Sequence, residues 1–407
     1  MMQNPADPEA AFRYARLAAA AGQPQAAIAA LERVLRINPR LDNIRLELAS
    51  LYLATGAPEA AGVLLRQALV SPDIPPEVAD RARGMLARAD QGTSRTRLFG
   101  SVFAGARYDT NANEQPLGGR VVFSPDRTQV FPIQLDPSFS GRSSWSSVLS
   151  GNLTHQWDLG LQREGTLETS LSLYDQRYAR VPRDYDISIA SLETGPRLGI
   201  ADLGETGSLT IRPFVSAVAI TYADSLYATL LGGGATLQAR FGDRWTVGLT
   251  GLVQGGNYLN SGFRPRARDN TGVVSTGIAS LSYNFDPTTA LTLRAGLSRA
   301  ETRQAYLDND GWFIGASFGT TFRLGDYAFG AGLRAGYRRR NYDSPDPTID
   351  PNRARRDRRY EAGVTLILPI TPTLAATAEF DWYDQRSNII NYRYDNKATI
   401  LGLRYSF

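Results

Sequence analysis

The sequence predicts an α + transmembrane β fold: a short α-helical solenoid followed by a 14-stranded antiparallel β-barrel. Three observations support this prediction. Apolar residues recur with a helical period over residues 8–90, and from about Leu98 the pattern switches to alternation of apolar and polar residues. The alternating segments run about 12–15 residues, which is longer than strands of soluble proteins and sufficient to cross a bilayer at a tilt. The chain also ends on an alternating segment whose last residue is the aromatic Phe407.

The composition excludes several classes of protein. A mean hydropathy of −0.27 and the absence of any run of about 18 apolar residues exclude a helical membrane protein. The chain of 407 residues has no cysteine, so disulfides and cysteine-based metal sites are excluded. A net charge of +4 is too small for a nucleic-acid-binding surface. Residues 1–5 lack the features of a secretory signal, and for an exported protein we expect either that the signal has been removed or that the start of the chain is trimmed.

The first part of the chain contains a repeat. Ala15, Gly22, Ala27 and Leu31 recur 34 residues later as Ala49, Gly56, Ala61 and Leu65. This spacing resembles the tetratricopeptide repeat, in which helical hairpins stack through small residues. Another alanine-rich helical bundle is the alternative. The helical period predicts helices over residues 8–21, 24–37, 42–55, 58–70 and 76–89.

A stacked array of this kind offers a concave surface to a peptide or partner protein. We therefore take Tyr52, Leu31 and Leu65 as candidate client-binding residues. The predicted helical domain covers residues 1–92 and the predicted barrel covers residues 93–407.

The second part contains fourteen alternating segments. In the clearest of them, Trp145, Leu149, Leu153 and Trp157 share one face and polar residues occupy the other. The predicted strands are 97–109, 143–157, 164–177, 185–197, 207–221, 226–240, 244–257, 271–285, 289–302, 310–323, 326–340, 357–368, 372–386 and 394–407.

The connections between these segments alternate between long and short. The long ones include 110–142, 258–270, 303–309 and 341–356; the short ones include 242–243, 286–288 and 369–371. Outer-membrane barrels have short periplasmic turns and longer external loops. Since an even strand number puts both barrel ends on one side, the sequence predicts an outer-membrane barrel with its helical domain in the periplasm.

Aromatic residues lie beside the short turns or at the chain end, as an interfacial girdle requires; scattered strand-end hydrophobics are the alternative. They are Trp157, Phe241, Trp245, Phe285, Phe322 and Phe407. Leu403, Tyr405 and Phe407 form the predicted assembly signal for the barrel-assembly machinery. Outer-membrane lipids and lipopolysaccharide are further expected partners.

The sequence offers little material for catalysis. The only histidine, His155, lies in a predicted strand, and we expect it to be structural or lumen-facing. Asp343, Asp346 and Asp350 do not have EF-hand spacing, and a solvated loop is the favoured interpretation. We therefore expect no enzyme activity, no cofactor and no metal.

Arginines are dense around the loop 341–356. They are Arg338, Arg339 and Arg340 before it, and Arg353, Arg355, Arg356, Arg358 and Arg359 at its far end. The favoured interpretation is that they bind lipopolysaccharide phosphates, for which the guanidinium fork is suited. Lining a translocation path is the alternative.

Two segments carry a family resemblance. Tyr108-Asp109-Thr110-Asn111-Ala112-Asn113 follows the first predicted strand, and Arg386-Ser387-Asn388-Ile389-Ile390-Asn391-Tyr392 precedes the last. With helical repeats in front and fourteen strands ending at Phe407, the chain resembles the Slam family, the surface lipoprotein assembly modifiers. The family-like motif residues are Tyr108, Asp109, Asn111, Asn113, Ser387 and Asn388.

The resemblance implies a non-enzymatic factor that helps a client, a surface lipoprotein or a secreted haemophore-type protein, to cross the outer membrane. The alternative is an outer-membrane conduit for polysaccharide or small solutes. A barrel protease or lipase is disfavoured because no histidine-centred site can be formed.

Overall fold

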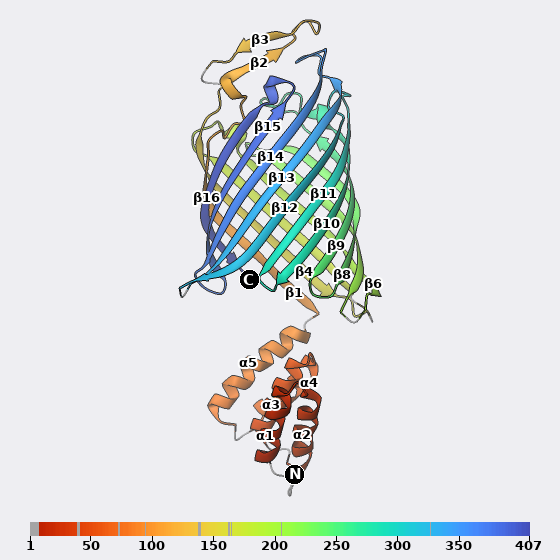
Figure 1. Cartoon of the computed structure of the whole chain (residues 1–407), viewed down its shortest axis with the longest axis vertical. Coiled ribbons are helices and arrows are strands. Elements are labelled where there is room, and N and C mark those ends of the chain that lie inside the picture. Colours follow the sequence, from red (N-terminus) through yellow and green to blue (C-terminus); the bar gives the residue numbers. More distant parts are fainter. Residues whose placement is uncertain are drawn as a thin grey trace. The chain divides into compact units, whose positions relative to one another are not determined.

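The computed structural model divides the chain into two compact units, Met1–Arg95 and Thr96–Phe407. It describes residues 8–38, 41–71, 74–93, 95–136, 140–161, 163, 165–204, 206–325 and 327–407. Figure 1 shows the helices of the first unit and the strands of the second. Among the described residues, no helix has both the length and the apolar character needed to span a membrane.

The described residues of the first unit form five helices. They are α1 (Pro8–Ala20), α2 (Pro24–Ile37), α3 (Asp42–Ala54), α4 (Pro58–Leu69) and α5 (Pro76–Thr93). Pro24 and Pro58 stand in the first turn of α2 and α4, where the missing N–H has no helical partner to lose. Gly22 and Gly56 precede them with φ of 75° and 78°, a left-handed conformation that glycine adopts without strain.

Small residues bring these helices together. Ala27, Ala49 and Ala61 have no exposed surface, so the helices approach closely at these positions. Two clusters form the interior: one joins Ala15, Ala27 and Leu31, and the other joins Ala49, Ala61 and Leu65 with residues of α5. The positions that repeat in the sequence are therefore the positions that pack.

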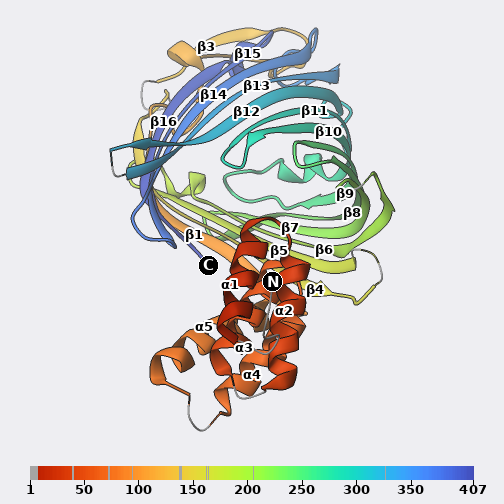
Figure 2. The same ribbon diagram turned by 60° about the horizontal axis from the view of Figure 1, so that its bottom comes forward.

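The second unit is a closed antiparallel barrel of fourteen strands, in which β1 pairs with β16 on one side and β4 on the other. Figure 2 shows the ring of strands obliquely. The strands are β1 (Thr96–Asp109), β4 (Ser144–Asp158), β5 (Gly165–Tyr178), β6 (Ile187–Asp202), β7 (Ser208–Tyr222), β8 (Ser225–Phe241), β9 (Trp245–Tyr258), β10 (Gly272–Asp286), β11 (Thr289–Thr302), β12 (Asn309–Leu324), β13 (Tyr327–Pro345), β14 (Ala354–Pro369), β15 (Leu374–Ser387) and β16 (Tyr394–Ser406).

The strands place apolar side chains outside and polar side chains inside. On β4, Trp145, Leu149 and Trp157 are about half exposed on the outer face, while Ser146 is buried on the inner one. Register carries this alternation across neighbouring strands, since Leu153 on β4 lies opposite Leu171 on β5, which lies opposite Leu192 on β6. The predicted fold class, helical repeats followed by a 14-stranded barrel, is confirmed.

Outward aromatics occur at two levels. Phe241, Trp245, Phe285 and Phe322 are exposed beside the short turns. Toward the other end, Trp312, Tyr337 and Tyr360 form a row across β12–β14 with ring centroids 5.1 Å apart. Ten residues separate Trp312 from Phe322 on β12, which spans about 25 Å at the usual strand rise and barrel tilt. That spacing equals the height of an apolar membrane band.

Two features differ from expectation. The loop 110–142 contains a hairpin of two short strands, β2 (Arg120–Phe123) and β3 (Phe131–Gln134), which the sequence-based prediction missed. Strands of four residues have too few positions for alternation to identify them.

The second difference concerns His155. It lies on the outward face of β4, in register with the exposed Leu98. The sequence left open a lumen-facing position for this histidine, and that possibility is wrong.

Candidate functional site

The first family-like motif closes a seam between the first and last strands. Asn396 on β16 donates from Nδ2 to Asp109 Oδ1 at 2.6 Å, and its Oδ1 accepts the backbone N–H of Asn111 at 2.9 Å. Arg107 donates to the same carboxylate at 2.8 Å. Asp109 and Asn396 are each 1% exposed. Buried polar groups must be satisfied, and here they satisfy one another.

The same motif ties together the two ends of the loop 110–142. Asn113 Oδ1 accepts the backbone N–H of Arg142 at 2.8 Å, and its Nδ2 donates to the Ser140 carbonyl at 3.1 Å. The Ala112 N–H donates to the Arg142 carbonyl at 2.8 Å. Tyr108 packs on Trp145 with ring centroids 5.2 Å apart. The motif therefore anchors the base of this long loop.

The second motif anchors loops on the other side of β16. Asn388 bridges β15 to β14, because its Oδ1 accepts the Arg356 N–H at 2.7 Å and its Nδ2 donates to the Ala354 carbonyl at 2.8 Å. Ser387 Oγ accepts the N–H of Ile389 at 3.2 Å, and the Ser387 carbonyl accepts from Arg393 Nε at 2.6 Å. The motif side chains therefore bind backbone N–H and carbonyl groups and fix the conformation of these loops.

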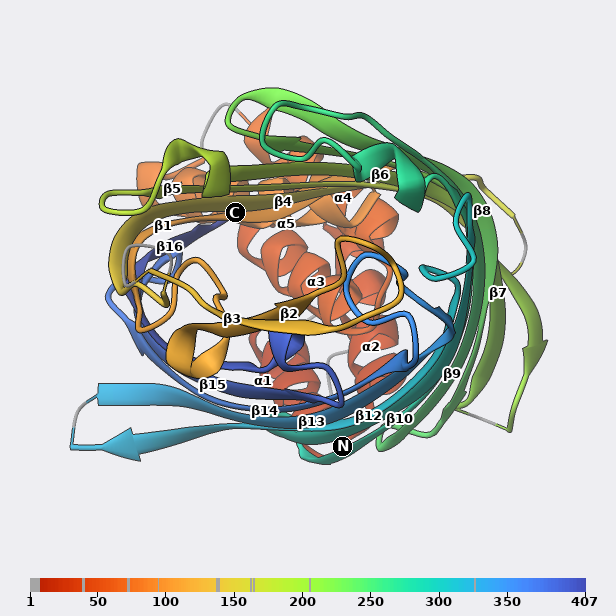
Figure 3. The same ribbon diagram turned by 90° about the horizontal axis from the view of Figure 1, so that it is seen from above.

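The second motif also holds the loop 110–142, which follows the first motif. Asn391 holds the backbone of Val122 in β2 from both sides, accepting its N–H at 2.7 Å and donating to its carbonyl at 2.8 Å. The Leu117 N–H donates to the Arg393 carbonyl at 2.9 Å. Figure 3 shows β2 and β3 running across the open end of the barrel. We call residues 110–136 together with 140–142 the cap.

The cap also reaches distant strands and inward side chains. Glu114 accepts hydrogen bonds from the hydroxyls of Tyr383 at 2.9 Å and Tyr394 at 3.1 Å, on β15 and β16. The Ser124 N–H donates to the Thr348 carbonyl in the β13–β14 loop at 2.9 Å. A cavity of about 540 Å³ lies between the cap and the start of β16.

Further loops join the cap through Arg266. Its guanidinium donates to Thr348 Oγ1 at 3.0 Å and to the Tyr306 hydroxyl, linking three long loops. Tyr306 in turn donates to Asp269 at 2.9 Å. Burial, followed by the hydrogen bond to Asp269, raises the pKa of Tyr306 to about 12, so this hydroxyl remains a donor at alkaline pH values at which a free tyrosine ionises.

Mixed charges line the interior below the cap. On β5–β7, Glu168 accepts from Arg197 at 2.8 Å and pairs with Arg212 at 3.1 Å. On the far side of the ring, Arg334 pairs with Asp381, and Arg338 lies 4.0 Å from Glu361. The interior is therefore polar on both walls and suited to hydrated or charged cargo.

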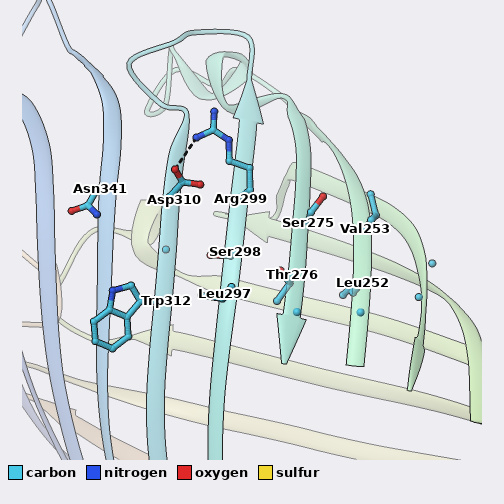
Figure 4. Close-up of a pocket in the computed structure, with 15 residues that line it drawn as sticks. Leu252, Val253, Ser275, Thr276, Leu297, Ser298, Arg299, Asp310, Trp312 and Asn341 are labelled. Carbon is cyan, nitrogen blue, oxygen red and sulfur yellow. Dashed lines mark hydrogen bonds and ion pairs between the residues drawn. The ribbon is translucent and has the colours of Figure 1, made fainter. Parts of the chain in front are cut away.

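The outer wall carries a separate hollow of about 740 Å³. It extends across β8–β13, and Figure 4 shows the lining residues Leu297, Trp312 and Asn341. The lining also includes Gly233, Gly251 and Gly277, which leave space beside the exposed Leu297 and Trp312. Arg299 bridges Asp310 at 3.2 Å and Asp343 at 2.7 Å at its upper end. This apolar hollow faces outward and is not part of the interior.

The three acids at the end of β13 and in the β13–β14 connection serve local contacts; β13 and β14 extend to Pro345 and from Ala354, into the predicted loop 341–356. Asp343 binds Arg299, while the carboxylates of Asp346 and Asp350 accept the backbone N–H groups of Thr348 and Asn352. No cluster of metal-ligating side chains occurs within the described part of the chain.

The candidate client-binding residues of the helical unit separate into two kinds. Leu31 and Leu65 are completely buried, so the expectation that they contact a client is corrected: they pack the helices. Tyr52 is partly buried and donates its hydroxyl to Glu32 of the neighbouring helix. This hydrogen bond, with burial and the charge of Glu32, raises the pKa of Tyr52 to about 12.

The predicted basic surface divides between the two faces of the sheet. Arg338, Arg340, Arg355 and Arg359 alternate onto the inner face, where Arg355 stacks on Tyr392 with its guanidinium carbon 3.3 Å from the ring centroid. Arg339, Arg356 and Arg358 lie on the outer face. Because neighbours in a strand point to opposite sides, the outer arginines remain candidates for lipopolysaccharide phosphates and the inner ones for lining the interior, so each of the two interpretations applies to part of the set.

Comparisons with known proteins add to this description. Residues 18–72 match the family model described as tetratricopeptide repeat. A search of curated protein sequences found no match.

Solved structures similar to the chain include outer-membrane barrels. The outer membrane channel DcaP of Acinetobacter baumannii has 11% identity and a TM-score of 0.39, covering 77% of this chain and 97% of that one. The COG4313 outer membrane channel from Pseudomonas putida F1 has 15% identity and a TM-score of 0.37, covering 76% and 95%. Similarities of this size carry no information on cargo. The helical part of the chain thus matches tetratricopeptide repeats over residues 18–72.

Proposed function

We propose that the protein is an outer-membrane translocation factor, whose helical unit captures a client protein in the periplasm and whose barrel provides or guides its passage. The client class is a surface lipoprotein or a secreted haemophore-type protein, as the resemblance to the Slam family implies. Membrane placement is supported by the closed ring, the outward apolar face and the two levels of aromatics.

The observation that carries this proposal is the pairing of two units in one chain. Tetratricopeptide-type repeats present a surface for peptides and partner proteins, and residues 18–72 match that family. A polar, closed barrel follows in the same chain.

The cap has a place in this mechanism. Both Slam-like motifs supply side chains that hold it: Asn111 binds the backbone of Gln115 and Asn113 that of Arg142 at its base, and Asn391 binds that of Val122 in β2. Since the cap crosses the open end of the barrel (Figure 3), passage requires its displacement. A client delivered from the periplasmic side would supply the free energy for that displacement.

The test is a deletion strain complemented with the full chain or with residues 93–407 alone. A specific exported protein should accumulate in the periplasm without the gene and reach the surface with the full chain. The barrel alone should insert, shown by heat-modifiable gel mobility, but should not restore display. Normal surface display of every neighbouring lipoprotein or secreted product in the deletion strain would remove this function.

The charged interior supports a second candidate, a conduit for polysaccharide or small solutes. Glu168, Arg197 and Arg212 on one wall, and Arg334 with Asp381 on the other, present charged groups to hydrated cargo. Planar-bilayer recordings distinguish the two. A steady, wide conductance with loss of glycan export in the deletion strain would favour the conduit.

A further inference from the structure

Three arginines form a row on the outer face of neighbouring strands. Arg339 on β13 lies opposite Arg358 on β14, which lies opposite Arg386 on β15. Each is an even number of residues from an exposed apolar side chain of the same strand in unbroken register, so all three point outward. These reference side chains are Leu333, Val364 and Phe380.

The row lies just beyond the aromatic level at the loop end of the barrel. Arg339 follows Tyr337 by two residues, and Arg358 precedes Tyr360 by two, with both tyrosines in the row described above. In a membrane barrel, aromatic rings mark the boundary between hydrocarbon and headgroups. The arginines therefore lie at headgroup level.

The charges in this row are poorly compensated. Like charges directly opposite one another destabilise a sheet. Arg386 is paired with Asp384 at 2.8 Å, and Arg339 donates to the amide oxygen of Asn341 at 3.2 Å. Arg358, and the exposed Arg356 two residues before it, have no ion-pair partner among the described residues.

The acids on either side do not neutralise the row. Asp310 and Asp343 are both bound by Arg299. Beyond β15, Asp395 lies opposite Asp384 and ends the basic surface. Within the row, the four outward arginines thus have only Asp384, which Arg386 already binds, and Asp395 lies at its edge. This excess of positive charge is the arrangement expected for an anion held between the arginines.

We propose that Arg339, Arg356, Arg358 and Arg386 form a binding site for the phosphate groups of a lipid headgroup, specifically a phosphorylated glycolipid of the lipid A type. This rests on the outer-membrane placement proposed above. Guanidinium groups bind phosphate oxygens through two parallel N–H···O bonds. Neighbouring strands about 5 Å apart place three such forks around one headgroup. The acyl chains lie against the apolar band below.

Binding to the full-length protein in detergent tests this site. Native mass spectrometry would compare lipid A, dephosphorylated lipid A and inorganic phosphate on the wild type and on R339Q/R358Q/R386Q. Loss of several charge-assisted hydrogen bonds should weaken lipid A binding at least about tenfold. R340Q is the matched control, because Arg340 is adjacent in sequence but faces inward, and it should bind normally.

Each outcome has a distinct meaning. Equal lipid A binding by the triple variant, or equal binding of dephosphorylated lipid by the wild type, would overturn the site. Displacement of lipid A by equimolar inorganic phosphate would show a free-anion site and overturn the lipid assignment. Heat-modifiable mobility of all variants is measured in parallel, so failure of the barrel placement itself is recognised separately.

Discussion

Asn396 and Asp109 are 287 residues apart in sequence, yet the amide of one donates to the carboxylate of the other at 2.6 Å. They sit on the last and first strands of the barrel, where the ring closes. The hydrogen bond therefore links barrel closure to the base of the cap.

We expect N396A to destabilise the barrel by about 1–3 kcal/mol, because it leaves Asp109 and the Asn111 N–H buried without this partner. The measurement is the temperature at which the compact form on a gel converts to the unfolded form. N257A is the control, since Asn257 is exposed on β9. Equal temperatures for the two variants would contradict a closing role for Asn396.

A disulfide should lock the cap. The backbone hydrogen bond from Ser124 to Thr348 at 2.9 Å brings these residues close enough for a bridge, and the chain has no native cysteine to compete. S124C/T348C should block client display or conductance when oxidised and recover on reduction. S124C alone should not respond to oxidant. Full activity of the oxidised double variant would show that the cap does not move.

Stability of the helical unit should depend on pH through Tyr52. Its pKa is raised to about 12 in the folded unit, against about 10 in an unfolded chain. The resulting stabilisation is complete below about pH 10 and is lost as pH rises toward 12. Urea unfolding at several pH values should show that the free energy of unfolding decreases over this range. The Y52F variant should lack the part of this decrease that comes from Tyr52. An identical profile for Y52F would exclude the Tyr52–Glu32 hydrogen bond as its origin.

Substitution at Ala61 tests the helical packing. A61F should overpack the completely buried position and destabilise the unit by about 1–3 kcal/mol. A54F places the same ring at the exposed end of α3 and should have little effect. Thermal unfolding of the helical unit is the readout, and equal midpoints would argue against repeat-type contacts at Ala61.

Removal of Phe407 should impair barrel assembly. Its backbone N–H and carbonyl pair with Gly100 at 3.1 and 3.0 Å, and its ring stacks near Tyr405 with centroids 6.0 Å apart. Deletion removes the last pairing between β16 and β1 together with the terminal aromatic. Surface levels of folded protein provide the measurement, and F407Y serves as the conservative control. Wild-type levels of the deletion would rule out an assembly signal at this residue.

Periodicity made most of the fold predictable. A strand with an apolar environment on one face and a polar environment on the other must alternate apolar and polar residues. Fourteen such segments could be located because each is long. The hairpin β2–β3 was missed because four-residue strands carry too little pattern. Leu31 and Leu65 were misassigned because repeat positions report packing, and packing positions are buried.

The site was harder to predict than the fold. The two asparagine-rich segments were recognised, but their meeting through Asn391 and Val122 depends on how the loop 110–142 folds. No local pattern encodes that contact across 269 residues. Similarly, the arginine run was visible in the sequence, while its division between two faces follows from register.

That division makes β13 sensitive to the length of the chain. Insertion of one residue between Gly336 and Tyr337 would exchange the environments of everything that follows before the loop. Arg338 and Arg340 would turn toward the headgroups, and Arg339 would enter the channel. The register of this one strand, to within a single residue, therefore determines which charges face the cargo inside the barrel and which charges face the surrounding membrane.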